Sequence, residues 1–202
     1  MTKDKKQKNA HLWVRDPDDW YVENDWCADA LFEKIAFDGP ITDPACGIGR
    51  VLDSAKRNGY RCNGFDIKCR DNIDQRHVFA IADFFATKRR YKNIVSNPPY
   101  KYDDEFLRVA IARTDDTVAL LLRTQWANGS ARSAWLEKLP LAYKLDLTPR
   151  PSMPPGAVIL AGDSPGGGQT DYAWYVFRHG YQGEPKYGWA RRPAHFKARA
   201  KK

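Results

Sequence analysis

The stretch ITDPACGIGR, residues 41–50, decides the fold, because it joins an apolar run to an amphipathic segment. Its pattern predicts a strand from Ile41 to Ala45, a glycine turn, and a helix from Arg50 to Arg57. Gly47 and Gly49 allow the backbone to approach a ligand closely and to take dihedral angles that side chains resist. The third glycine of a dinucleotide fingerprint and the GxxxxGK[ST] pattern of a phosphate loop are both missing, so this GxG alone indicates only a turn.

The alternation of strand and helix patterns continues along the chain. Further strands are expected at residues 61–67, 77–85, 91–96 and 116–124, and helices at residues 26–37, 103–114 and 130–139. Two late segments, 142–149 and 171–180, read as strands with no helix pattern in the Pro/Gly-rich stretch between them, so they should pair antiparallel. We therefore expect a single α/β domain whose mostly parallel sheet ends in an antiparallel edge.

The composition favours a globular protein with an anionic partner. The 202-residue chain is long enough for one domain with a full core, and its net charge of +8 favours a polyanion. That charge gathers at the two ends, in residues 1–8 and 186–202. We expect a basic leader at residues 1–17 and a basic tail at residues 183–202, each of them either an arm for nucleic acid or a solubilising terminus.

The four cysteines, at positions 27, 46, 62 and 69, form no CxxC pair, and no apolar signal region follows the N-terminus. The protein is therefore expected to be cytoplasmic with reduced thiols. Cys62, Cys69 and His77 do not have the spacing of a common metal site, so no metal is expected. No stretch approaches the roughly 18 apolar residues of a transmembrane helix, which predicts no membrane partner.

Polar side chains follow several of the predicted strands. Asp66 ends the second strand, 17 residues after Gly49, near the spacing at which a carboxylate holds ribose hydroxyls. Asp83 and Phe84 end the third strand and combine an acid with an aromatic ring, which suits the amine and ring face of an adenine. Asn97 ends the fourth strand. Each alone would read as a strand-end cap, but together with the glycine turn they lie along the carboxyl edge of the sheet, where ligands bind.

Four motifs in order carry a resemblance to a known family: DPACGIG at residues 43–49, FDI at 65–67, ADFF at 82–85 and SNPPY at 96–100. They resemble the motif set of the S-adenosylmethionine-dependent amino-methyltransferases that act on adenine N6 in DNA, in particular small phage- and prophage-type members. The resemblance covers roughly residues 18–182. It implies a Rossmann-like class I methyltransferase fold, with a mostly parallel seven-stranded sheet and an antiparallel C-terminal edge strand.

The sequence departs from this family in two respects. Residues 21–24 read Tyr-Val-Glu-Asn, where the family often has Tyr-x-Thr-Pro. No separate target-recognition domain is expected, so sequence specificity must come from loops or be low.

The resemblance implies S-adenosyl-L-methionine as the cofactor and assigns residues to it. Asp66 would hold the ribose hydroxyls, and Ile67 would pack on the adenine. Asp83 would accept a hydrogen bond from the adenine amine, and Phe84 would flank its ring. The remaining predicted cofactor residues, most of them around the methionine part, are Tyr21, Asn24, Asp43, Ala45, Gly47, Gly49 and Asn97.

The corner Asn97-Pro98-Pro99-Tyr100 suits an amine substrate, and its four residues are the predicted catalytic residues. Two adjacent prolines cannot continue a strand ladder, because neither has an N–H to donate, so the chain stiffens there. An exocyclic adenine amine is a poor nucleophile, since its lone pair is delocalised into the ring. The Asn97 oxygen and the Pro98 carbonyl can accept its two protons and localise that pair. Tyr100 can stack on the base, which must be flipped out of any duplex.

Contacts to nucleic acid are expected mainly beyond the predicted fifth strand. The residues are Lys101, Arg123, Trp126, Asn128, Arg132 and Arg150, with plain packing as the alternative for Trp126 and Asn128. The loop at residues 149–170 has a length that is typical of functional or disordered segments. Its run Gly166-Gly167-Gly168 favours the hinge of an element that closes on DNA, with a simple surface insertion as the alternative.

The sequence therefore favours methyl transfer to adenine N6, with DNA as the partner. The tetrapeptide NPPY also occurs in enzymes that methylate a glutamine side-chain amide or a guanine amine in RNA. Both groups have a planar nitrogen whose lone pair is delocalised, as in adenine. A non-catalytic nucleic-acid-binding subunit of the same fold is a further alternative. Such proteins typically degrade the glycine turn or the tetrapeptide, and both are intact here.

Overall fold

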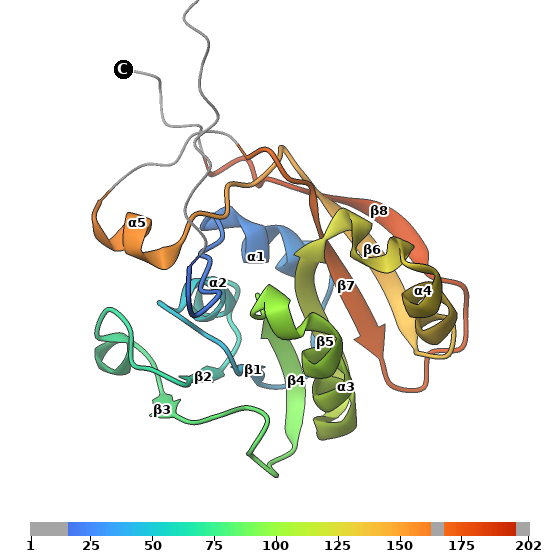
Figure 1. Cartoon of the computed structure of the whole chain (residues 1–202), viewed down its shortest axis with the longest axis horizontal. Helices are drawn as coiled ribbons and strands as arrows, with labels where there is room; N and C mark the ends of the chain where they lie inside the picture. Colours follow the sequence, from blue (N-terminus) through green and yellow to red (C-terminus); the bar gives the residue numbers. More distant parts are fainter. Residues whose placement is uncertain (1–15, 163–167, 197–202) are drawn as a thin grey trace, which may run out of the picture.

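The computed structural model describes residues 16–162 and 168–196. Residues 1–15 of the predicted leader, Gly166 and Gly167 of the predicted hinge, and the end of the predicted tail lie outside the described residues. An eight-stranded sheet runs through the molecule in the order β3-β2-β1-β4-β5-β7-β6-β8 (Figure 1). Its strands are β1 (Ile41–Asp43), β2 (Cys62–Asp66), β3 (Phe79–Ile81), β4 (Tyr91–Ser96), β5 (Thr114–Arg123), β6 (Leu141–Thr148), β7 (Tyr172–Arg178) and β8 (Lys186–Arg191).

The strand directions place most carboxyl ends at one edge of the sheet. Strands β1 to β5 are mutually parallel, and β7 runs antiparallel between β5 and β6. Strand β8 is parallel to β6, so both run in the same direction as β5. The predicted mostly parallel α/β sheet is confirmed, and so is the antiparallel pairing of the two late strands.

Helices cover both faces of the sheet (Figure 1). They are α1 (Trp26–Phe32), α2 (Arg50–Arg57), α3 (Asp103–Arg113), α4 (Ser130–Leu136) and α5 (Gly156–Leu160), with 3-10 turns η1 (Ile73–Gln75), η2 (Tyr100–Tyr102) and η3 (Thr124–Asn128). Side chains of α1 and α2 share one buried cluster with the sheet, and side chains of α3 and α4 share another. The two clusters lie on opposite faces, because successive residues of each strand point to opposite sides.

The central strand β5 shows how apolar sequence sets this arrangement. Val118 and Leu120 pack with the α3 side of the core, whereas Ala119 and Leu121 pack with the α1 side, and all four are buried. The strand expected at residues 116–124 is therefore confirmed, and it is buried on both faces. Each fully buried Leu or Val contributes roughly 1.5–3 kcal/mol relative to an exposed one, so this strand anchors the site at its carboxyl end.

Five details differ from the sequence-based expectation. The sheet has eight strands rather than seven, because residues 186–191 of the predicted tail form β8, and the antiparallel strand β7 is internal rather than at the edge. Helix α1 ends at Phe32 instead of Phe37, although Ile35 stays buried after the turn. Strand β3 covers only three residues of the expected 77–85. The loop 149–170 contains α5, which begins directly after two prolines.

No helix in the described part of the chain is long and apolar enough to span a membrane. Within residues 16–162 and 168–196, no three His, Cys, Asp or Glu side chains gather as a metal site requires. All four cysteines are free thiols, with Cys27 and Cys46 buried and Cys69 exposed.

Candidate active site

The glycine turn between β1 and α2 needs glycine at both predicted positions. Gly47 has a φ of +51° and Gly49 a φ of +87°, which L side chains rarely adopt. The Gly47 N–H donates a hydrogen bond to Oδ2 of Asp66 at 2.9 Å, which ties the turn to the end of β2. A side chain at position 47 would also come within 2.9 Å of the Trp20 indole nitrogen. The turn is therefore both strained for other residues and closed over by Trp20.

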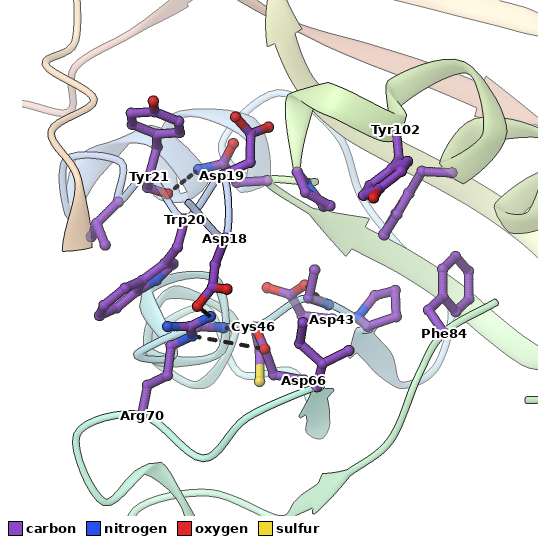
Figure 2. A pocket seen from close by; sticks show the side chains of 18 of the residues that line it. Asp18, Asp19, Trp20, Tyr21, Asp43, Cys46, Asp66, Arg70, Phe84 and Tyr102 are labelled. Atoms are coloured by element: carbon purple, nitrogen blue, oxygen red, sulfur yellow. Dashed lines mark hydrogen bonds and ion pairs between the residues drawn. The ribbon is translucent and has the colours of Figure 1, made fainter. Parts of the chain in front are cut away.

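A cavity of about 390 Å³, the first cavity, opens at the carboxyl ends of β1, β2 and β4 (Figure 2). The predicted cofactor residues that line it are Tyr21, Asp43, Ala45, Gly47, Asp66, Ile67, Asp83, Phe84 and Asn97. Ile67 is 56% exposed and presents its side chain at the cavity mouth. Two predicted cofactor residues do not line the cavity. Gly49 caps α2 behind it, and Oδ1 of Asn24 accepts a hydrogen bond from the backbone N–H of Ser152 instead.

Carboxyl groups dominate the polar lining of the first cavity. Asp43 is buried, and its Oδ1 accepts hydrogen bonds from Ser96 Oγ at 2.7 Å and from the Ala45 N–H at 3.1 Å. Burial raises the pKa of Asp43 to about 8 and also raises the pKa of Glu23. Seven acidic residues line the cavity (Asp18, Asp19, Glu23, Asp43, Asp66, Asp83 and Glu105) against two arginines, Arg50 and Arg70. Even without Asp43 and Glu23, whose burial favours the protonated form, five acids face two arginines, and this balance favours a ligand that carries positive charge.

Sequence reasoning missed the wall that Trp20 and Arg70 form on one side of the cavity. The Arg70 guanidinium lies 4.2 Å from the centre of the Trp20 ring and 3.3 Å from Oδ2 of Asp18 (Figure 2). It also lies 3.8 Å from Oδ1 of Asp66. Trp20 precedes the helix expected at residues 26–37, and Arg70 follows β2 in an irregular stretch. Neither segment has a periodicity that could have signalled this contact.

The rigid corner after β4 holds the Asn97 amide in one orientation. Nδ2 of Asn97 donates to the Tyr21 carbonyl at 3.0 Å and to Oε2 of Glu23 at 2.8 Å. A carbonyl can only accept, so the amide nitrogen must face Tyr21 and Glu23, and the Oδ1 atom must face the opposite direction. The Tyr100 hydroxyl donates to that Oδ1 at 2.9 Å, which leaves one further lone pair. Within the described residues no donor reaches the Pro98 carbonyl.

A second cavity, of about 530 Å³, lies on the other side of this corner. Its lining is aromatic and charged: Asp19, Tyr21, Tyr100, Asp103, Arg123, Gln125, Trp126 and Arg132. Asp19 and Tyr21 line both cavities. Asn97 and Pro99 line the first cavity and Tyr100 the second, so the corner Asn97-Pro98-Pro99-Tyr100 touches both.

The residues predicted to contact nucleic acid divide into two groups. Arg123, Trp126 and Arg132 line the second cavity, together with the predicted stacking residue Tyr100. Lys101, Asn128 and Arg150 do not. Lys101 donates its backbone N–H to Asp19 at 2.7 Å, Asn128 ends η3, and the exposed Arg150 forms an ion pair with Asp171 at 2.5 Å.

The ring of Tyr100 is already packed between two other tyrosines. Its centre lies 6.1 Å from that of Tyr21 and 5.8 Å from that of Tyr172. The Arg123 guanidinium lies 5.8 Å from the same ring. These neighbours hold Tyr100 as part of the second cavity's wall. The described part of the loop 149–170 supports this region, since the Val22 N–H donates to the Pro154 carbonyl.

Comparison with known proteins gives the fold a context. No family model matches the chain, and no curated protein matches it significantly. A protein assigned as the modification subunit of a type I restriction enzyme from Vibrio vulnificus YJ016 has a TM-score of 0.56 at 12% identity, over 83% of this chain and 46% of that longer one. The 23S rRNA methyltransferase ErmE has a TM-score of 0.52 at 12% identity, over 80% and 70%. The protein named Thermoplasma acidophilum 1320 has a TM-score of 0.53 at 15% identity, over 77% of this chain and 84% of that one. The chain therefore has the Rossmann-like fold of class I methyltransferases.

Proposed function

We propose that this protein transfers a methyl group from S-adenosyl-L-methionine to the N6 amine of adenine in DNA. One observation carries the proposal: the corner Asn97-Pro98-Pro99-Tyr100 lines two cavities at once. A methyl donor in the first cavity and a target base in the second would meet at this corner. Such a meeting of two bound partners supplies the proximity on which a transfer reaction depends.

The first cavity fits the methyl donor in size and chemistry. Its volume of about 390 Å³ lies within the range of small-ligand sites. The Asp66 carboxylate beside the glycine turn would bind ribose hydroxyls, and Ile67 and Phe84 offer apolar contacts for an adenine ring. The excess of carboxyl groups suits a ligand with an ammonium and a sulfonium. When bound there, S-adenosyl-L-methionine supplies an electrophilic methyl group on its sulfonium and leaves as S-adenosyl-L-homocysteine.

The chain's own contribution to the reaction is to prepare the amine. The free lone pair of Asn97 Oδ1 and the Pro98 carbonyl would accept the two protons of an exocyclic amine and localise its nitrogen lone pair. That pair forms the new N–C bond, and the nitrogen then releases one proton to water. Preorganised acceptors of this kind are worth roughly 3–4 kcal/mol in other enzymes. Glu23 and the Tyr21 carbonyl keep the amide in the required orientation.

The second cavity supports a nucleobase as the target. Tyr100 and Trp126 give it an aromatic wall, and Arg123 offers positive charge for a phosphate, while Arg132 is ion-paired with Asp104. A base that enters it must leave any duplex, as in other enzymes that act on bases. DNA is favoured over RNA by the motif resemblance. Among the proteins of similar fold one is assigned to a DNA restriction system and one is an rRNA methyltransferase, so RNA belongs in the test.

The test incubates the purified protein with methyl-labelled S-adenosyl-L-methionine and unmethylated DNA, followed by digestion to nucleosides and mass spectrometry. We expect N6-methyldeoxyadenosine with the parent protein and at least 100-fold less with Asn97→Ala. Asn63→Ala is the matched control, since it removes the same atoms from β2 outside both cavities.

Donor binding to Asn97→Ala, measured by calorimetry, should persist, because other residues make most of the first cavity. Label in RNA or in a glutamine-containing peptide, with none in DNA, would contradict the choice of substrate. DNA binding without any donor binding would indicate a non-catalytic subunit instead.

A further inference from the structure

Two large aromatic side chains stand exposed on the edge strand β8. Tyr187 is 59% exposed and Trp189 is 52% exposed. Strand β8 pairs only with β6 in the sheet of the described residues, so these rings lie at its margin (Figure 1). Trp and Tyr side chains bury large apolar areas when they can, and an exposed pair of them marks a surface that binds something.

The alternation of β8 explains which side chains face outward together. Ala190 is buried in the core on the α1 side, so the odd-numbered residues Tyr187, Trp189 and Arg191 lie on the opposite face. Tyr187 pairs in register with Lys144 of β6, which therefore shares this face. We call the four residues Lys144, Tyr187, Trp189 and Arg191 the β8 strip.

Internal contacts hold the strip in place. The rings of Tyr187 and Trp189 lie 5.5 Å apart at 73° to each other. The Tyr187 hydroxyl donates to Oδ2 of Asp146 at 2.8 Å. The Arg191 guanidinium lies 5.8 Å from the Trp189 ring. These contacts restrict the rotamers in advance, which lowers the entropy lost when a ligand binds.

The charge around the strip favours a polyanion. Within the described residues, neither Lys144 nor Arg191 forms an ion pair with an acid. Asp146 pairs in register with Trp189 and places one carboxylate on the same face, where it accepts from Tyr187. The sequence from residue 191 to residue 202 contains six Lys and Arg and no Asp or Glu. Because β8 runs parallel to β5, its basic end lies at the same edge of the sheet as the corner at Asn97.

Contacts also connect the strip to the second cavity. Trp126, in the wall of that cavity, lies edge-on to Tyr175 at 5.1 Å between ring centres. The Lys144 ammonium lies 5.7 Å from the same Tyr175 ring. Lys144 in turn pairs in register with Tyr187. These contacts link the strip to the wall of the second cavity through the ring of Tyr175, which is itself fully buried.

We propose that the β8 strip binds the single-stranded segment of DNA next to the target base, with bases stacked on Tyr187 and Trp189 and phosphates at Lys144 and Arg191. This inference rests on the proposed function, because it assumes a nucleic-acid substrate in the second cavity. Unpaired bases are favoured over a duplex, since a duplex hides the base faces that these rings would contact. The two rings stand at 73° to each other, so their open faces point in different directions, toward different bases.

The first test measures binding of a fluorescent 20-nucleotide thymidine oligomer by anisotropy. Stacking is worth about 1–3 kcal/mol per base, so the loss of both rings in Tyr187→Ala/Trp189→Ala should weaken binding by roughly 30-fold or more. Tyr187→Phe/Trp189→Phe keeps both ring faces and should stay within about 3-fold of the parent. Val78→Ala/Ile81→Ala removes exposed apolar side chains beside and on β3, at the opposite edge, and is the matched control.

The second test maps the contact directly. An oligomer that contains 5-iododeoxyuridine is cross-linked to the parent protein by light and the protein is digested with trypsin. Cleavage after Lys186 and Arg191 releases residues 187–191, the peptide YGWAR. An adduct on this peptide supports the proposal, whereas cross-links confined to other peptides overturn it.

The outcomes separate this inference from the proposed function. If Tyr187→Ala/Trp189→Ala methylates DNA and binds the oligomer as the parent does, the strip is not a DNA surface and the proposed function stands. If the parent neither binds nor methylates any nucleic acid, both the inference about the strip and the proposed function are wrong. Self-association of the parent that the alanine pair abolishes, with oligomer binding unchanged, would identify the strip as a contact between copies of the chain and overturn the DNA assignment.

Discussion

Oε2 of Glu23 accepts a hydrogen bond from Nδ2 of Asn97 at 2.8 Å, across 74 residues of sequence. Glu23 is buried, and Asn97 stands at the end of β4 in the rigid corner. The contact holds the amide nitrogen of Asn97 toward Glu23 and the Tyr21 carbonyl, and its oxygen toward the Tyr100 hydroxyl. Glu23 is therefore a positioning residue for the atom that we propose accepts a proton from the target amine.

Removal of this contact should lower turnover more than donor affinity. In Glu23→Ala the amide of Asn97 keeps only the Tyr21 carbonyl as an acceptor and can rotate, so we expect kcat to fall by about 10- to 100-fold. Glu23→Gln is the matched variant, since its side-chain oxygen can still accept from Nδ2, and it should retain activity within about 5-fold. Initial rates at saturating donor and DNA measure both. Equal losses of kcat in the two variants would show that turnover depends on the negative charge of Glu23 and not on the orientation of the Asn97 amide.

The Asp66 carboxylate should be the main polar anchor of the donor. Its Oδ2 accepts from the Gly47 N–H and its Oδ1 from the Lys68 N–H, and the carboxylate lines the first cavity. Asp66→Asn keeps an oxygen for Gly47 but loses the second acceptor and the charge, so donor affinity should fall by roughly 10-fold or more. Calorimetry with S-adenosyl-L-homocysteine measures this. Asp38→Ala, at an exposed acid outside the cavity, is the control. Unchanged affinity in Asp66→Asn would remove Asp66 from the proposed site.

Local sequence predicted the parts of the site that follow strands. The glycine turn, Asp66, Asp83 and Asn97 were predictable because each follows an apolar run, and parallel strands bring their ends to one edge. The role of Trp20 could not be predicted from the sequence, because Trp20 reaches the glycine turn only through the tertiary fold. Its position depends on a distant segment that carries no matching pattern.

The edge of the sheet was harder to predict for a similar reason. Strand β8 has only one buried residue, Ala190, and its other positions are charged, aromatic or glycine. This pattern is weaker than that of β7, which is buried from Tyr172 to Phe177. The insertion of β7 between β5 and β6 depends on non-local pairing, which periodicity along one segment cannot reveal.

Gly156 should tolerate no side chain while Trp20 is present. A Cβ atom at position 156 would lie 2.2 Å from the Trp20 ring. Alanine in a helix is favoured over glycine by about 1 kcal/mol, but overpacking of this kind costs about 1–3 kcal/mol or more. We therefore expect Gly156→Ala to lower the free energy of unfolding and weaken donor binding, because Trp20 also lines the first cavity.

A double-mutant cycle isolates this clash. The loss of unfolding free energy in Trp20→Ala/Gly156→Ala should be smaller than the sum of the losses in the two single variants. The reason is that Trp20→Ala removes the ring atoms with which the new Cβ at position 156 collides. Urea unfolding of the four proteins gives the coupling free energy. Additive effects would show that the chain accommodates a side chain at position 156 without contact to Trp20.

Asp43 should make the stability of the protein fall as pH rises. Burial raises its pKa from about 3.8 in the unfolded chain to about 8 in the folded one. Between these values the folded state binds more protons than the unfolded state, so the free energy of unfolding decreases with increasing pH. The contribution is fully present below about pH 4 and is lost as the pH passes through about 8. Glu23 and Asp103, whose pKa values are also raised by burial, add slopes of the same sign.

Asp43→Asn separates this contribution from the others. An asparagine oxygen can still accept from Ser96 Oγ and the Ala45 N–H, so the packing and both hydrogen bonds are kept while the titration is removed. Relative to the parent, the variant should gain stability progressively from pH 5 to pH 8, by on the order of a few kcal/mol, and the gain should level off above that. Urea unfolding followed by tryptophan fluorescence, without the methyl donor, gives the difference at each pH. A difference that stays constant from pH 5 to pH 9 would mean that Asp43 is ionised throughout, and the first cavity would then hold a fixed negative charge beside the methyl donor.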